Sequence, residues 1–260
     1  MSAPTGEWFD ELITRWNSDR KRQGDLAASE YRPLAFPEQV MVVLAENQPI
    51  DAAAVLPHRL HIGQELRGMT VPFGIVHDWQ AATVIPLIRE AIERCGGEGT
   101  AQGALLGLHR RAAEGDLVVE SKWSQALRLA LYELYWHAYP HKAVYGETYA
   151  RNHRLQRDRG ADEATAVEVA QAVADLKRTT HARAFAEANA AANARALAAA
   201  YARTDPVAFA KALPFAQMHA CARVWAAGSG PGQEAVARAE CYRRLADGLS
   251  AALLREFDGS

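Results

Sequence analysis

An alanine-rich tract is the feature of the sequence that most constrains the fold. Ten of the fifteen residues from Ala186 to Ala200 are alanine, and helical spacing extends over residues 162–204. Alanine is the strongest helix former, and its small side chain lets two helix axes approach closely. The tract therefore predicts a long, tightly packed helix. Because alanine offers little apolar area, this helix needs a close partner, either within the chain or in a second copy.

The length of this tract raises a question about its continuity. An unbroken helix over residues 162–204 would be about 60 Å long, more than a compact domain of 260 residues accommodates. We therefore place a break at the β-branched pair Thr179 and Thr180. Asn189 and Asn193, four residues apart, are interpreted as surface residues, with hydrogen bonds across a helix interface as the alternative.

The rest of the chain also has apolar residues at helical spacing, with proline and glycine at the interruptions. Residues 48–77 are the exception, because six prolines and glycines there predict a long irregular loop. Residues 69–76 have a strand-like pattern, which Pro72 and Gly74 limit to an edge or a turn. The sequence thus predicts an all-α fold, a single domain over residues 1–260 with eight or nine helices. The predicted helices are 5–22, 37–46, 79–95, 101–114, 121–139, 141–157, 162–204, 206–227 with a kink at Pro214, and 233–257.

Three of the predicted helices begin with a recognisable N-cap. Thr100 and Ser121 precede helical patterns, and Asp205 is followed by Pro206, which combines a cap with proline at the first helical position.

Charge and cysteine content narrow the partners and the compartment. The net charge of −2 gives no general attraction to nucleic acid or to anionic lipid. The first residues lack the features of a secretory signal, and no apolar run approaches the roughly 20 residues that a bilayer requires. Cys95, Cys221 and Cys241 are widely spaced, which argues against a disulfide framework or a CxxC metal site. We expect a cytoplasmic protein with no nucleic-acid or membrane partner.

Common functional signatures are absent from the sequence. It contains neither of the glycine-rich nucleotide loops GxGxxG and GxxxxGK[ST], no GxSxG elbow and no HExxH motif. The identity of any cofactor therefore stays open, and the nine histidines are the most informative residues.

The predicted helix at 121–139 has two apolar faces. Aliphatic side chains gather around its centre on one face, and aromatic side chains lie on nearly the opposite face. The aliphatic face comprises Trp123, Leu127, Ala130, Leu131, Leu134 and Ala138, and the aromatic face comprises Tyr132, Trp136 and Tyr139. Such a helix is expected to be covered on both sides, or to line a pocket or an interface.

A carboxylate and two histidines lie near the end of this helix. Glu133 and His137 are four residues apart and so are neighbours on the helix surface, and His141 follows one turn later. A carboxylate beside an imidazole suits general acid–base catalysis, and the same groups suit metal or haem ligation. We interpret them as candidate catalytic residues; the alternative is an ordinary surface pair beside core aromatics. The aromatic residues expected to contact a substrate are Trp136, Tyr139 and Tyr145.

A second group of histidines falls in the irregular region. His58, His61 and His77 precede the helix at 79–95 and are expected to contact a substrate, to bind an anionic group, or to close over a pocket as a lid. The alternative is that they are loop histidines bonded to backbone carbonyls.

The remaining polar clusters are interpreted as structural or solvated. His109 and His181 neighbour arginines and are expected to face solvent. The arginine run at 151–159 would suit nucleic acid, but it includes Asp158 and lies in a near-neutral chain, which argues against that partner.

Two functions are compatible with these patterns, and we prefer the first because histidine, tyrosine and tryptophan are concentrated on a helix that is expected to be covered on both faces. One is a small-molecule enzyme with an interhelical His/Glu/Tyr site, with metal or haem dependence left open. The other is a non-catalytic interaction protein that forms a homo-oligomer, or binds a partner protein, through the alanine-rich helix.

Overall fold

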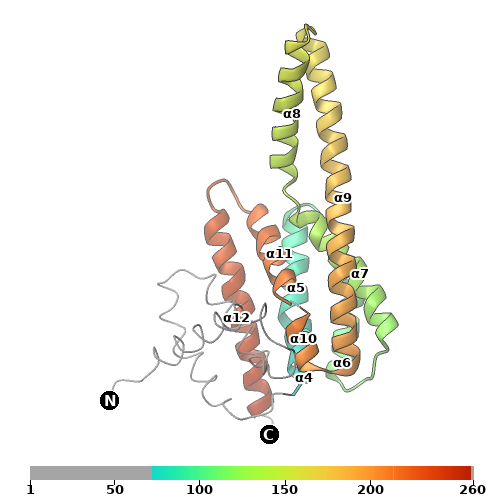
Figure 1. Ribbon diagram of the computed structural model, residues 1–260. Coiled ribbons are helices and arrows are strands. Elements are labelled where there is room, and N and C mark those ends of the chain that lie inside the picture. Colours follow the sequence, from blue (N-terminus) through green and yellow to red (C-terminus); the bar gives the residue numbers. More distant parts are fainter. Residues whose placement is uncertain (1–71, 213, 259–260) are drawn as a thin grey trace, which may run out of the picture.

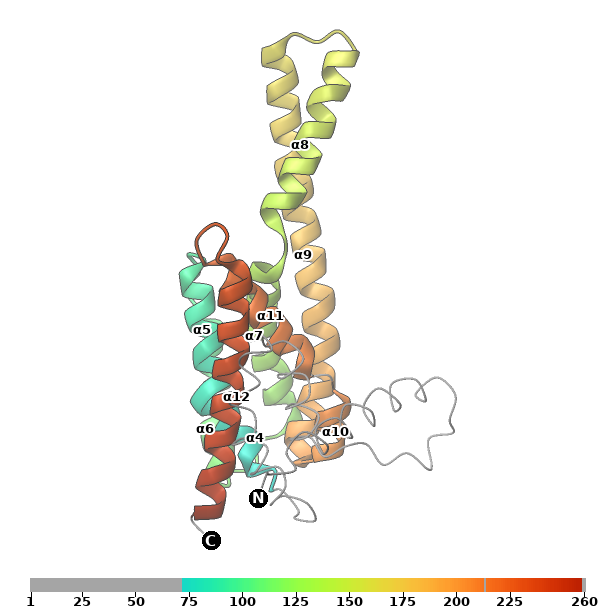
Figure 2. The ribbon, with the colours of Figure 1, turned by 90° about the vertical axis from the view of Figure 1, so that its left-hand side faces the viewer.

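The computed structural model describes residues 72–212 and 214–258, and this part of the chain is all-α, as predicted. It forms a helical body from which a two-helix hairpin projects (Figures 1 and 2). The predicted helices at 5–22 and 37–46, and the irregular region up to residue 71, lie outside the described residues. The helices are α4 (Gly74–Trp79), α5 (Ile85–Arg94), α6 (Ala101–Ala113), α7 (Glu120–Ala138), α8 (His141–Asp158), α9 (Glu163–Arg203), α10 (Pro206–Lys211), α11 (Pro214–Ala227) and α12 (Glu234–Asp258).

The strand-like interpretation of residues 69–76 is wrong for its last residues, because helix α4 already begins at Gly74. The predicted irregular loop, expected to run to residue 77, is wrong for residues 74–77 for the same reason. A π-helical turn, Gln80–Val84, joins α4 to α5. Pro86 lies at the start of α5. A proline cannot donate the regular helical hydrogen bond, and the wider π turn directly before it accommodates this loss. Trp79 anchors the segment, since its indole N–H donates to the carbonyl of Leu245 in α12 at 3.1 Å.

The core of the body forms around the aliphatic face of α7. Trp123, Leu127, Leu131 and Leu134 on this face are all buried, as the periodicity predicts. Helices α5, α6, α9 and α11 pack against α7, and α12 covers α11 on the far side. The N-cap position of α7 is Val119 rather than Ser121, and it makes no side-chain cap bond.

Helix α9 runs without interruption for 41 residues. The predicted break at Thr179 and Thr180 is therefore wrong: a pair of β-branched residues lowers helix propensity by only about 0.5 kcal/mol each, too little against the packing on both sides. Alanines recur every fourth residue along its buried stripe, except at Arg178, and this confirms the predicted close packing. The stripe comprises Ala166, Ala170, Ala174, Ala182, Ala186, Ala190, Ala194 and Ala198. Its partners are α8 and α7 of the same chain.

The structure confirms the predicted cap at Asp205 but differs from the expected kink at Pro214 and from the alternative interpretation of the two asparagines of α9. Asp205 caps α10 by accepting from the backbone N–H groups of Val207 and Ala208. The expected kink at Pro214 is a full break that separates α10 from α11. Asn189 and Asn193 each donate to a carbonyl four residues earlier in α9, rather than across an interface.

The projecting hairpin, which we call the arm, consists of α8 and the first half of α9 (Figure 1). Its turn is fixed by Asp162, whose carboxylate caps α9 by accepting from the N–H of Thr165 at 2.8 Å. Along α8 only Thr148 is buried. The arm therefore encloses a narrow core of one threonine and several alanines, and most of its surface is open to solvent.

Candidate functional site

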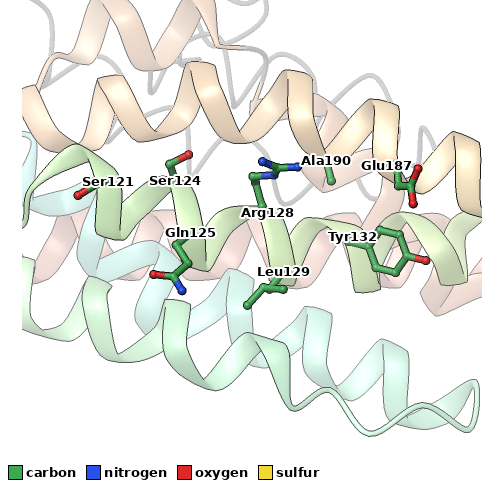
Figure 3. A pocket seen from close by; sticks show the side chains of 8 residues that line it. All are labelled: Ser121, Ser124, Gln125, Arg128, Leu129, Tyr132, Glu187 and Ala190. Carbon is green, nitrogen blue, oxygen red and sulfur yellow. The ribbon is translucent and has the colours of Figure 1, made fainter.

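The aromatic face of α7 lies at the surface of the body, opposite the buried aliphatic face. Tyr132, Trp136 and Tyr139 are half-buried, and Leu129 beside them is 58% exposed. The Leu129 side chain points from α7 toward the side of α6 (Figure 3) and lies outside the buried core. The predicted aromatic face thus remains partly open within the described structure.

Two open grooves meet on this face, and Leu129 and Tyr132 line both of them. The first groove, of about 590 Å³, lies between α7 and α9 and is shown in Figure 3; it is lined by Ser121, Ser124, Gln125, Arg128, Leu129, Tyr132, Glu187 and Ala190. The second, of about 640 Å³, reaches α6 and is lined by Thr100, Ala101, Ala104, Leu129, Tyr132, Glu133, Trp136 and Arg183. The grooves combine an apolar ridge with carboxylates and guanidinium groups.

Glu133 and His137 are adjacent on α7 but form no hydrogen bond with each other. Glu133 instead accepts a long hydrogen bond of 3.4 Å from Gln102 Nε2. The His137 imidazole lies against Gly97, where a β-carbon would approach Nε2 to 2.6 Å. Burial lowers the pKa of His137; the nearby Glu133 charge opposes this shift, and His141 adds to it. The imidazole is therefore neutral at pH 7.

His141 is brought together with two of the predicted aromatic residues. Its Nε2 lies 2.8 Å from the Trp136 carbonyl oxygen, and its ring centroid is 5.2 Å from those of both Trp136 and Tyr139. This contact bridges the end of α7 and the start of α8. The His141 Nε2 is hydrogen-bonded to this backbone carbonyl, so the imidazole serves in the structure to join the two helices.

Tyr145 lies apart from this cluster, on the arm. Its ring stacks on Tyr149, which stacks in turn on His153, and the Arg178 guanidinium lies 5.8 Å from its centroid. The predicted substrate-contacting residues therefore separate into a group near the grooves and a group along the arm.

The second predicted neighbourhood is placed differently. His58 and His61 lie outside the described residues. His77 is buried in α4, where its Nδ1 lies 3.0 Å from Nδ1 of His109. Burial lowers the pKa of His77 to about 4 and that of His109 well below its usual range, so both rings are neutral.

The expectation that His109 faces solvent is wrong, because this residue is completely buried. It follows the buried Leu105 by one helical turn on α6, so it shares the inward face, while the arginines after it point outward. Trp123 stacks on His77, and Tyr201 packs against both imidazoles. Both Nε2 atoms and the Tyr201 hydroxyl are buried, and none of them has a hydrogen-bond partner among the described residues. The i, i+4 spacing from Leu105 is the signal that could have revealed this cluster.

The arm presents a further surface that the sequence analysis missed. Val169, Val173 and Leu176 recur at i, i+4 and i+7 on α9, the spacing of a coiled-coil seam, beside the alanine stripe. Val173 is 37% exposed and Leu176 is 70% exposed. We call these three residues, with Glu147 and Arg151 on α8, the arm face.

Comparison of the chain with protein-family models, with curated proteins and with solved structures finds no match to any of them. Within residues 72–212 and 214–258 there is no group of three or more His, Cys, Asp or Glu side chains placed to hold a metal ion. No helix in the same part of the chain is both long and apolar enough to cross a membrane.

Proposed function

We propose that the protein is a non-catalytic interaction protein whose arm packs against another chain. The observation that carries this proposal is the apolar seam of the arm face, in which Val173 and Leu176 are exposed and Val169 is half-buried, on a hairpin that projects from the body. Large exposed apolar residues at heptad spacing are the pattern by which helices dock on one another.

The internal packing of the arm supports the same proposal. A core of alanines and one threonine buries far less apolar area than a leucine seam does. Helix α8 also contains Gly146, which lowers its intrinsic helix stability by about 1 kcal/mol relative to alanine. A partner packed on the arm face would bury the seam and would stabilise both helices of the hairpin.

Site-specific photo-crosslinking in cells tests this proposal. A photo-reactive amino acid replaces Leu176 in the arm face, and in a control variant it replaces Val236, which is 67% exposed on α12. The proposal predicts a discrete crosslinked product at position 176 that the additional substitution Val173→Glu abolishes. No product at 176 above that at 236 would show that the arm face has no partner.

A small-molecule enzyme remains a second candidate, favoured by one observation. Glu133 lines the larger groove together with Arg183 and two aromatic rings, and the neutral His137 follows one turn along α7. Such a groove offers a carboxylate, a guanidinium and an unprotonated imidazole to a ligand. The absorption spectrum and metal content of the purified protein test this candidate: a Soret band or stoichiometric iron or zinc that is lost in His137→Ala would favour it over the interaction protein.

A further inference from the structure

The two helices of the arm have a defined register. The Arg157 guanidinium lies 3.4 Å from the Glu163 carboxylate, and Arg178 lies over the Tyr145 ring. Residues of α8 and α9 whose numbers add to about 320 therefore lie side by side. By this relation Glu147 lies beside Val173.

The same contacts define the two sides of the arm. Arg178 and Tyr145 touch, so they lie on one side. On α9 the seam residues Val169, Val173 and Leu176 are rotated the opposite way from Arg178, relative to the buried alanines. On α8 Glu147 and Arg151 are likewise rotated the opposite way from Tyr145, relative to the buried Thr148. The seam and this charged pair therefore share the other side, which is the arm face.

The charges on the arm face are available to a partner. Glu147 and Arg151 are both exposed, and within the described part of the chain neither of them forms an ion pair. They are four residues apart along α8, which is the spacing at which such a pair commonly forms within one helix. Both charges thus remain free to meet opposite charges on another molecule.

The arm face is self-complementary about a single point. Val169 and Leu176 are symmetric about a level between residues 172 and 173 of α9. Glu147 and Arg151 are symmetric about residue 149 of α8, which by the same relation lies level with residue 171 of α9. The two centres therefore coincide within about 3 Å of helical rise. A two-fold axis at this level brings Val169 opposite Leu176 of the second copy, and Glu147 opposite Arg151 of the second copy.

We propose, on the basis of the proposed function, that the partner of the arm face is a second copy of this chain, whose arm packs antiparallel on the first. The two hairpins form a four-helix bundle in which α9 meets α9 and α8 meets α8. The two seams bury each other, and two Glu147–Arg151 pairs flank them. A parallel arrangement would place α8 over α9 and leave both charges facing apolar residues.

The size of the interface sets the expected affinity. Each arm helix spans about 27 Å, and the apolar part of each face consists of three residues. This places the contact at the small end of specific interfaces. We expect a reversible dimer with a dissociation constant in the micromolar range, on the order of 1–100 µM.

Disulfide trapping tests the antiparallel register. Val169→Cys and Leu176→Cys are purified separately, with tags of different mass, and oxidised alone or mixed with copper phenanthroline. The proposal predicts that only the mixture forms a rapid disulfide dimer, because each cysteine faces the other position in the second copy. Equal crosslinking of each variant alone, or no crosslinking of the mixture at 100 µM protein, would overturn it. The wild-type chain controls for its native cysteines, two of which are buried.

A charge exchange tests the pairing of Glu147 with Arg151. Glu147→Arg or Arg151→Glu alone is expected to weaken dimerisation at least tenfold, and the double variant is expected to restore it. If the two single variants and the double variant dimerise with equal affinity, the assigned register is contradicted. A monomeric purified protein that crosslinks to a different chain at position 176 would overturn the self-association but keep the proposed function, and no crosslinking at all would overturn both.

Discussion

The buried His77–His109 pair predicts a loss of stability on mild acidification. Burial lowers the folded-state pKa of His77 to about 4 from its ordinary value of 6.5. Between these values the unfolded chain takes up the proton while the folded chain excludes it. The stability that depends on a neutral His77 is therefore fully present above about pH 6.5 and is lost as the pH falls towards 4.

The size of the effect follows from the shift. A shift of this size destabilises the folded state by about 2 kcal/mol at pH 5, relative to neutral pH. Burial lowers the pKa of His109 in the same direction, and a proton on His77 would lower it further. For a chain of this length we expect the melting temperature to fall by about 4–8 °C between pH 7 and pH 5.

Urea unfolding at pH 7 and pH 5 measures this loss directly. The double variant His77→Asn/His109→Asn keeps polar groups at both sites but removes the titrating imidazoles, so its stability should change much less between the two values. His181→Asn, at an exposed position on α9, is the matched control and should behave as the wild type. If the wild type and the double variant lose equal stability, other groups cause the acid sensitivity and the reasoning about this pair is wrong.

Three further predictions concern the α7 site, a helix contact and the arm. Leu134→Ala should cost about 2–5 kcal/mol in urea unfolding, and His137→Ala on the order of 1 kcal/mol; similar losses would make His137 a core residue. Gly248→Ala should destabilise the protein by about 1–3 kcal/mol, because a β-carbon there meets the Thr83 side chain at 2.2–2.6 Å, and Thr83→Ala should recover part of this loss in the same assay. Deleting residues 147–157 and 164–174, about three turns from each arm helix, should leave the melting temperature of the body within about 4 °C of the wild type; an unfolded circular-dichroism spectrum would show that the body depends on the arm.

The parts of the fold that follow from local periodicity were predictable. The buried face of α7 around Leu127 was identified from spacing alone, because helical side chains repeat with the helix period whatever they pack against. The cap of α10 by Asp205 was also predictable, since a cap depends only on the next few residues.

The failures concern features that depend on distant segments. The continuity of α9 through Thr179 and Thr180 depends on α8 and α7, which cover successive parts of the same alanine stripe. The spacing from Leu105 indicates that His109 is buried, but its pairing with His77 depends on α4, and no local pattern in α6 reveals that partner.

The candidate site was only partly predicted, because the contacts of its side chains also depend on distant segments. Spacing places Glu133 and His137 side by side on α7, but it does not fix the side-chain rotamers or the surrounding groups. In the structure Glu133 interacts with Gln102 and His137 lies against Gly97. The arm face was not predicted because Val169, Val173 and Leu176 are interleaved with alanines, and spacing alone does not show which of these neighbouring stripes α8 covers.

Sedimentation equilibrium of the purified chain is the most direct test of the central claim, that the arm binds another chain and that this chain is a second copy. The account predicts that the apparent mass rises reversibly from 28.4 kDa towards twice that value between about 1 and 100 µM. It also predicts that Val173→Glu removes this rise, while Val236→Glu on the body leaves it unchanged. A wild-type chain that remains at 28.4 kDa over the whole range, or a dimer unaffected by Val173→Glu, would contradict it.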